Sequence, residues 1–150
     1  MLEELEARIQ RLEDLEAIRR PKATYCDMCD DDHNAERIIT IFTEDGTWEG
    51  EGIGTAKGHQ AIRKLFEQFS DATKFSQHMV HNPIIDVYGD EAIGRWYFHG
   101  MFTMRRNDKP MWQACRYHKL YRRTPDGWKI HHLKIAEPKF AASYDKGWAL

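Results

Sequence analysis

An aspartate triplet and one histidine are the residues whose types and positions best suit proton transfer. Asp30-Asp31-Asp32 closes a helical stretch, and His78 stands among mostly uncharged neighbours in residues 76–79. Imidazole changes charge near neutral pH and suits a general base, and a carboxylate can orient its ring and stabilise the imidazolium. Helix termination or capping accounts for at least one aspartate, and a packed or surface histidine is the alternative for His78. The residues alone do not distinguish the three aspartates.

Two other patterns suggest metal or phosphate binding, and neither has the required geometry. Cys26-Asp27-Met28-Cys29 and His78-Met79-Val80-His81 have the residue types of a zinc site. Residues three apart on a strand point to opposite faces, so the two histidines cannot easily share an ion. Residues 50–54 are glycine-rich but lack the spacing of a nucleotide loop. We predict no metal and no cofactor: the cysteines pack in a helix and the glycines form a hairpin or pocket rim.

The chain has eight histidines. His131 and His132 are adjacent on a strand and face opposite ways, so at most one can line a pocket, and His131 is the candidate. Loop, helix-start or outward positions are expected for His33, His59, His99 and His118.

The spacing of apolar residues predicts helices followed by strands. The first helix is expected over 2–20, and a second over 22–30 after a break or kink at Pro21. A third helix is expected after Asn34, which caps it, and includes Ile38, Ile39 and Phe42. Trp48 falls in a short strand, residues 50–58 form an irregular loop, and residues 59–69 are helical again.

Long strands are expected over 75–88, 91–104, 111–123 and 127–136, with turns at 89–90 and 125–127. Helices followed by antiparallel strands indicate an α+β fold. In residues 91–104, small residues alternate with large aromatics on one face, which favours a strongly curved sheet. We predict a cone-shaped α+β barrel whose N-terminal helices pack on a mainly antiparallel sheet around a pocket.

Size and charge bound the function classes. A chain of 150 residues, taken as one domain (1–150), can bury a core without disulfides, and a net charge of −2 argues against nucleic-acid binding. No apolar run approaches the ~18 residues of a membrane span, so no membrane partner is expected. The acidic start without a signal-peptide pattern and three cysteines predict a cytoplasmic protein with reduced thiols.

Five segments together resemble the SnoaL-like branch of the nuclear transport factor 2 superfamily, and specifically its dehydratases. They are LEAIRR (15–20), TEDGTWEGEGIGTAKGHQAI (43–62), FSQHMVHNPIIDV (75–87), IGRWYF (93–98) and YHKLYRRTPDGWKI (117–130). Scytalone dehydratase, bile-acid 7α-dehydratase and hexachlorocyclohexane dehydrochlorinase are the characterised relatives that the chain resembles.

The resemblance implies an Asp–His pair in a cone-shaped pocket, formed here by Asp30 and His78, with Tyr25 as a catalytic tyrosine. It also implies substrate contacts. With the aromatic residues and the His131 candidate, the predicted substrate-binding set is Trp48, Phe66, Trp96, Phe98, Cys115, Tyr117, His131 and Leu133.

The chain also departs from these relatives. Scytalone dehydratase has a second pocket histidine where this chain has Trp96, and a tyrosine where it has Cys29. Its Ser and Asn pair is replaced here by Cys115 and Tyr117. Leu133 stands where the dehydrochlorinase has an arginine. The expected activity is a cofactor-independent dehydratase, a carbon–oxygen lyase acting on a hydrophobic cyclic or aromatic hydroxy-carbonyl compound.

Two alternatives stay open: an isomerase using the same pair, and a non-catalytic binding or assembly domain like a dioxygenase β subunit. The related dehydratases imply a homo-trimer, a dimer being common on this fold, and the outward apolar residues Ile93, Tyr97 and Met101 favour such self-association.

Overall fold

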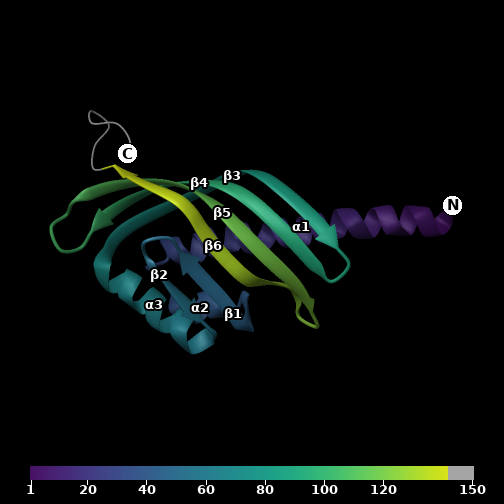
Figure 1. Ribbon diagram of the computed structural model, residues 1–150, viewed down its shortest axis with the longest axis horizontal. Coiled ribbons are helices and arrows are strands. Elements are labelled where there is room, and N and C mark those ends of the chain that lie inside the picture. Colours follow the sequence, from purple (N-terminus) through teal and green to yellow (C-terminus); the bar gives the residue numbers. More distant parts are fainter. Residues whose placement is uncertain (142–150) are drawn as a thin grey trace.

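The computed structural model describes residues 1–141 and follows the expected order of helices and then strands (Figure 1). The helices are α1 (Leu2–Asp30), α2 (Ala35–Ile39) and α3 (His59–Ala72). The strands are β1 (Phe42–Gly50), β2 (Gly54–Lys57), β3 (Thr73–Tyr88), β4 (Glu91–Met104), β5 (Pro110–Thr124) and β6 (Gly127–Ala141).

The strands form a six-stranded sheet in the order β2-β1-β6-β5-β4-β3. Strands β3 to β6 are joined as successive antiparallel hairpins, whereas β1 runs parallel to β6. The sheet is curved and does not close, and the second half of α1 runs along its concave side with α3 next to it (Figure 1). The α+β prediction with a curved, mainly antiparallel sheet is therefore confirmed.

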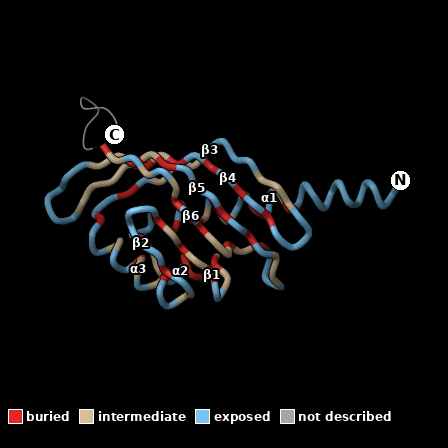
Figure 2. The backbone as a smooth tube through the Cα atoms, viewed as in Figure 1, coloured by how far each residue is buried: buried red, intermediate tan, exposed pale blue. Residues whose placement is uncertain are grey.

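The alternation of small and large residues in β4 explains the curvature. Buried and exposed positions alternate along its first half, with Gly94, Trp96, Phe98 and Gly100 facing inward (Figure 2). A Cβ on Gly100 would collide with the Phe98 ring and lie 2.8 Å from that of Phe102. The missing side chain lets two aromatic rings close over the backbone at this point.

Helix α1 is continuous through Pro21, so of the predicted break or kink the break is wrong. Proline removes one backbone hydrogen bond and crowds the preceding turn. The helix nevertheless continues because its second half is held by burial, with Ile18, Tyr25 and Cys29 in the core. The first residues of α1 are exposed and project past the sheet (Figure 2).

Two further boundaries differ from the sequence prediction. The Asn34 cap is confirmed, because its side chain accepts a hydrogen bond from the Arg37 backbone N–H at 3.2 Å. Helix α2 ends at Ile39, however, and Phe42 begins β1. The loop predicted over 50–58 contains β2, which pairs antiparallel with β1 across a reversal in which Gly52 adopts φ +72°.

A partly buried ion pair holds α1 against the sheet. Asp14 accepts two hydrogen bonds of 2.8 Å from the Arg123 guanidinium and one of 3.1 Å from Trp128 Nε1. The Arg123 hydrogen bond is the main reason that the pKa of Asp14 lies below its ordinary value. This contact fixes α1 along the sheet and hence the position of Asp30 at its end.

None of the helices within residues 1–141 has the length and hydropathy needed to cross a membrane.

Candidate active site

The structure distinguishes the three aspartates at the end of α1. Asp31 binds Arg37 at 2.8 Å and accepts a hydrogen bond from the Asn34 side chain. Asp32 reaches Arg105 only at 3.5 Å. Asp30 alone turns toward the sheet, where it meets His78 of β3. The first two carboxylates therefore stabilise the helix end and the following turn, and Asp30 is the one available for chemistry.

Asp30 and His78 form a short, well-oriented pair. The Asp30 Oδ1 to His78 Nδ1 distance is 2.6 Å, and the His78 backbone N–H donates to both Asp30 oxygens at 3.1 and 3.0 Å. The His78 side chain is only 7% exposed and that of Asp30 is 28% exposed. With Nδ1–H donated to the carboxylate, Nε2 is the nitrogen left to accept a proton.

Ser76 adds a third donor to Asp30. Its Oγ lies 3.2 Å from Asp30 Oδ1 and 3.2 Å from the Cys29 carbonyl oxygen. Ser76 and His78 are two residues apart on β3 and so point to the same face. Ser76 is not among the site residues predicted from the sequence, although its position two before the histidine on a strand is a usable signal.

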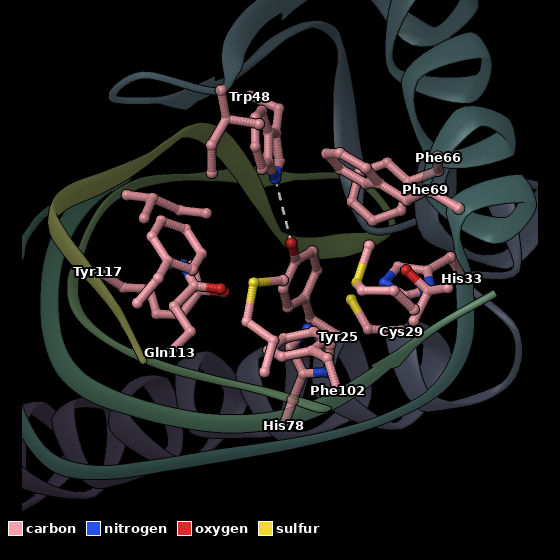
Figure 3. Close-up of a pocket in the computed structure, with 17 residues that line it drawn as sticks. Tyr25, Cys29, His33, Trp48, Phe66, Phe69, His78, Phe102, Gln113 and Tyr117 are labelled. Atoms are coloured by element: carbon pink, nitrogen blue, oxygen red, sulfur yellow. Dashed lines mark hydrogen bonds between the residues drawn. The ribbon is translucent and has the colours of Figure 1, made fainter. Parts of the chain in front are cut away.

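The ring of His78 lies in the wall of an apolar cavity of about 220 Å³ (Figure 3). Asp30 does not line the cavity and reaches it only through His78. Phe66 and Phe69 approach from α3, and Trp48 lies across the cavity from His78 (Figure 3). The lining residues are Tyr25, Cys29, His33, Trp48, Ile53, Phe66, Phe69, Ala72, Thr73, His78, Phe102, Met104, Met111, Gln113, Tyr117, Ile135 and Phe140.

Tyr25 places a hydroxyl inside this cavity. Its oxygen accepts a hydrogen bond of 3.1 Å from Trp48 Nε1 (Figure 3) and also interacts with Cys29. Burial raises the pKa of Tyr25 and of Tyr117 well above the ordinary tyrosine value. Both phenols are therefore neutral near pH 7 and can act as hydrogen-bond donors.

His33 also lines the cavity, which corrects the prediction of a loop histidine without a role in the pocket. Its ring packs between Phe69 and His78, with centroids 5.8 Å from each. Burial, with a smaller contribution from His78, lowers the pKa of His33 to about 4. The ring is therefore a neutral imidazole near pH 7.

Of the predicted substrate contacts, Trp48, Phe66 and Tyr117 line the cavity. The others lie outside its wall: Trp96, Phe98, Cys115, His131 and Leu133. Phe98 is packed behind the wall, with its ring 5.2 Å from that of His78.

The predicted contacts that do not line the cavity are excluded from it for different physical reasons. Trp96 and Leu133 precede the cavity-level parts of their strands and fill the core. Cys115 lies at a bulge between Ala114 and Arg116 and contributes to an outer groove. His131 points to the other face, where its Nδ1 lies 3.0 Å from Thr43 Oγ1.

The motifs considered for metal binding do not converge. Cys26 and Cys29 are buried in α1, whereas His81 stacks on Tyr97 on the opposite face of β3 from His78. Within residues 1–141, no three His, Cys, Asp or Glu side chains are grouped so that they could hold a metal ion.

An open cone of helices and curved sheet around an apolar cavity defines a small-molecule site. The chain belongs to the SnoaL-like domain family, which matches residues 10–134. No curated protein sequence matches the chain.

Solved structures show the same fold. A nuclear transport factor 2-like protein with a cystatin-like fold from Novosphingobium aromaticivorans is 30% identical, with a TM-score of 0.71 over 91% of this chain and 89% of that one. A candidate scytalone dehydratase from the same species is 20% identical, with a TM-score of 0.81 over 89% and 90%. The hexachlorocyclohexane dehydrochlorinase LinA-type3 from Novosphingobium barchaimii is 21% identical, with a TM-score of 0.79 over 91% and 95%.

Proposed function

We propose that the protein is a dehydratase that eliminates water from a hydrophobic cyclic or aromatic hydroxy-carbonyl compound. The observation that carries this proposal is the 2.6 Å Asp30–His78 contact, with the histidine ring in the wall of an apolar cavity. A purely structural ion pair would not need to present its imidazole to an apolar cavity. The fold shared with proteins named as dehydratases and a dehydrochlorinase supports the same reaction class.

In the proposed reaction, His78 Nε2 removes the acidic proton next to the substrate carbonyl. The C–H electron pair enters the enolate and then forms the carbon–carbon double bond as the β C–O bond breaks. The proton taken by His78 and the departing hydroxyl leave together as one water. Asp30 holds the tautomer of His78 and stabilises the transient imidazolium.

In this proposal, neutral phenols bind the carbonyl oxygen of the substrate. Tyr25 and Tyr117 line the cavity, and we assign them as hydrogen-bond donors to the oxygen on which negative charge develops. Trp48, Phe66 and Phe69 provide apolar walls that favour a ring over an extended polar chain.

The direct test is a panel of β-hydroxy cyclic ketones, with formation of the conjugated enone followed by ultraviolet absorbance. A general probe for the base is 5-nitrobenzisoxazole, which opens to a coloured nitrophenolate when a base removes its ring proton. Changing His78→Gln is expected to lower either rate by about 10²–10⁴-fold, the usual contribution of general acid–base catalysis.

His81→Gln is the matched control, because His81 lies three residues further on the same strand and faces the other side of the sheet. It should retain the wild-type rates. Equal rates for the two variants would contradict the role of His78. If the wild-type protein exchanged the substrate α-proton in deuterated water without losing hydroxyl, His78 would carry out proton transfer alone, as an isomerase requires. Binding of the ketones without any turnover would indicate a ligand-binding domain.

A further inference from the structure

Two lysines are buried in the centre of the protein without an acidic partner. Lys22 on α1 is 0% exposed and Lys119 on β5 is 1% exposed. Within residues 1–141, neither Nζ has a carboxylate, carbonyl or hydroxyl hydrogen-bond partner. Each amine interacts instead with the other. An isolated buried ammonium is costly, so two of them side by side require an explanation.

The pair cannot hold two full charges cheaply. Burial lowers the pKa of both amines, and the mutual repulsion lowers that of Lys119 further. One ammonium can donate a hydrogen bond to one neutral amine, an arrangement that gives each nitrogen one partner. In that arrangement the Lys22–Lys119 pair carries a single positive charge in a medium of low dielectric constant.

The charge lies against two tyrosine rings of the cavity wall. Lys22 Nζ is 3.3 Å from the Tyr117 ring centroid and 4.9 Å from that of Tyr25, and Lys119 Nζ is 4.3 Å from the Tyr25 centroid. A cation over an aromatic face is stabilised by the electrons of the ring. Neither lysine lines the cavity, whereas both tyrosines do. The rings therefore separate the charge from the ligand space.

The other ionisable groups around the pair are thiols. Cys26 and Cys29 come from α1 and Cys115 from β5. Burial raises the pKa of Cys29 above its ordinary value and that of Cys115 to about 12. These two thiols are neutral near pH 7 and do not cancel the positive charge.

We propose that Lys22 and Lys119 share one proton behind Tyr25 and Tyr117, and thereby stabilise a negatively charged oxygen bound at this end of the cavity. The two lysines act through the phenols and are positioning residues, not catalytic ones. In the elimination, the stabilised oxygen is that of the enolate, so this role rests on the proposed function. The same charge also predicts a ligand preference that can be measured without catalysis.

The probe is 4-nitrophenol, whose ionised and neutral forms absorb differently. Wild-type protein should bind the phenolate at least tenfold more tightly than the neutral phenol, observed as a lowered apparent pKa of the bound dye. The double variant Lys22→Met/Lys119→Met should lose this preference and melt no lower than wild type, because apolar replacement of buried charges is often neutral or stabilising. Lys64→Met, which removes an exposed lysine of α3, is the matched control and should bind like wild type.

An unchanged phenolate preference in the folded double variant would overturn the proposal. If that variant does not fold, ¹³C NMR of lysine ε-carbons in wild-type protein provides the second measurement. The Lys22–Lys119 pair should lose its shared proton well below the ordinary lysine pKa, and phenolate affinity should fall at least tenfold over the same pH range. A flat affinity across that titration would also overturn the proposal. The phenolate preference is measured without turnover, so failure of the Asp30–His78 mechanism, seen as missing elimination, and failure of the lysine role, seen as an unchanged preference in the double variant, remain distinguishable.

Discussion

The ring of His33 lies edge-on to the ring of His78, with centroids 5.8 Å apart and planes at 74°. His33 follows α1 in a left-handed conformation, with φ +52°, which is uncommon for a residue with a side chain. Its backbone N–H donates to the Cys29 carbonyl at 2.9 Å, which holds the turn in place. The turn therefore brings a second, neutral imidazole to the cavity wall beside the first.

Lowering the pH should destabilise the protein through His33. Burial lowers its folded-state pKa to about 4, whereas an unfolded histidine has a pKa of ~6.5. The unfolded chain therefore binds the proton more readily, and the stability due to neutral His33 is complete above about pH 6.5. It declines as the pH falls toward 4, by about 3 kcal/mol in total. Urea unfolding measured between pH 7 and 4 tests this.

The variant His33→Asn isolates that contribution. Asparagine tolerates the left-handed conformation and does not titrate, so the variant should show a smaller fall in unfolding free energy over the same pH range. An identical pH dependence in wild type and variant would show that other groups cause the acid destabilisation.

The Asp30–His78 contact could be predicted because the sequence supplies both a local pattern and a resemblance. His78 lies on a strand whose alternation sets its face, and Asp30 closes a helix that packs against that strand. Without the resemblance, the sequence could not separate Asp30 from its neighbours. The choice depends on Arg37, which engages Asp27 and Asp31 from the next helix.

Lys22 and His33 show what sequence patterning cannot supply. A lysine in an amphipathic helix is expected at the surface, and a histidine in a polar turn is expected in solvent. Lys22 is buried because it lies on the face of α1 that packs into the concave side of the sheet, whereas Ala23 and Asp27 on the opposite face are exposed. His33 is buried because a positive-φ turn directs it inward. Both outcomes depend on tertiary packing.

Removing the Ser76 hydroxyl should lower the activity of the Asp30–His78 pair without unfolding the protein. Its Oγ is 3.2 Å from Asp30 Oδ1, so Ser76→Ala leaves that carboxylate with fewer donors and a less fixed orientation. We expect the rate with 5-nitrobenzisoxazole to fall roughly tenfold, the equivalent of one charge-assisted hydrogen bond of about 1.5 kcal/mol. Ser70→Ala on α3 provides the control and should keep the wild-type rate. A Ser76→Ala protein as active as wild type would show that the His78 contacts alone orient Asp30.

Adding a methyl group at Gly100 should displace the aromatic rings that pack against His78. Gly100 pairs with His78 in the sheet, and its missing side chain lets Phe98 and Phe102 lie 5.2 and 5.3 Å from the His78 ring. Gly100→Ala forces those rings to move, which should cost about 1–3 kcal/mol of stability and at least tenfold in rate. Gly94 lies on the same strand as Gly100 but away from His78, and Gly94→Ala crowds Trp96 of β4 and Tyr121 of β5. It should lower stability while largely preserving the rate, and equal rate losses in the two variants would contradict a local effect on His78.

Replacing Pro21 should stabilise the protein, because the helix continues through this residue. Pro21→Ala restores a backbone donor for the Ala17 carbonyl and relieves the ring contact with the preceding turn. Some of this gain is offset because the unfolded chain becomes more flexible, so we expect about 1–2 kcal/mol from urea unfolding. Pro110→Ala should change stability by less than about 0.5 kcal/mol, since Pro110 is the exposed first residue of β5. A less stable Pro21→Ala protein would mean that the proline ring contributes packing on α1 that outweighs the missing hydrogen bond.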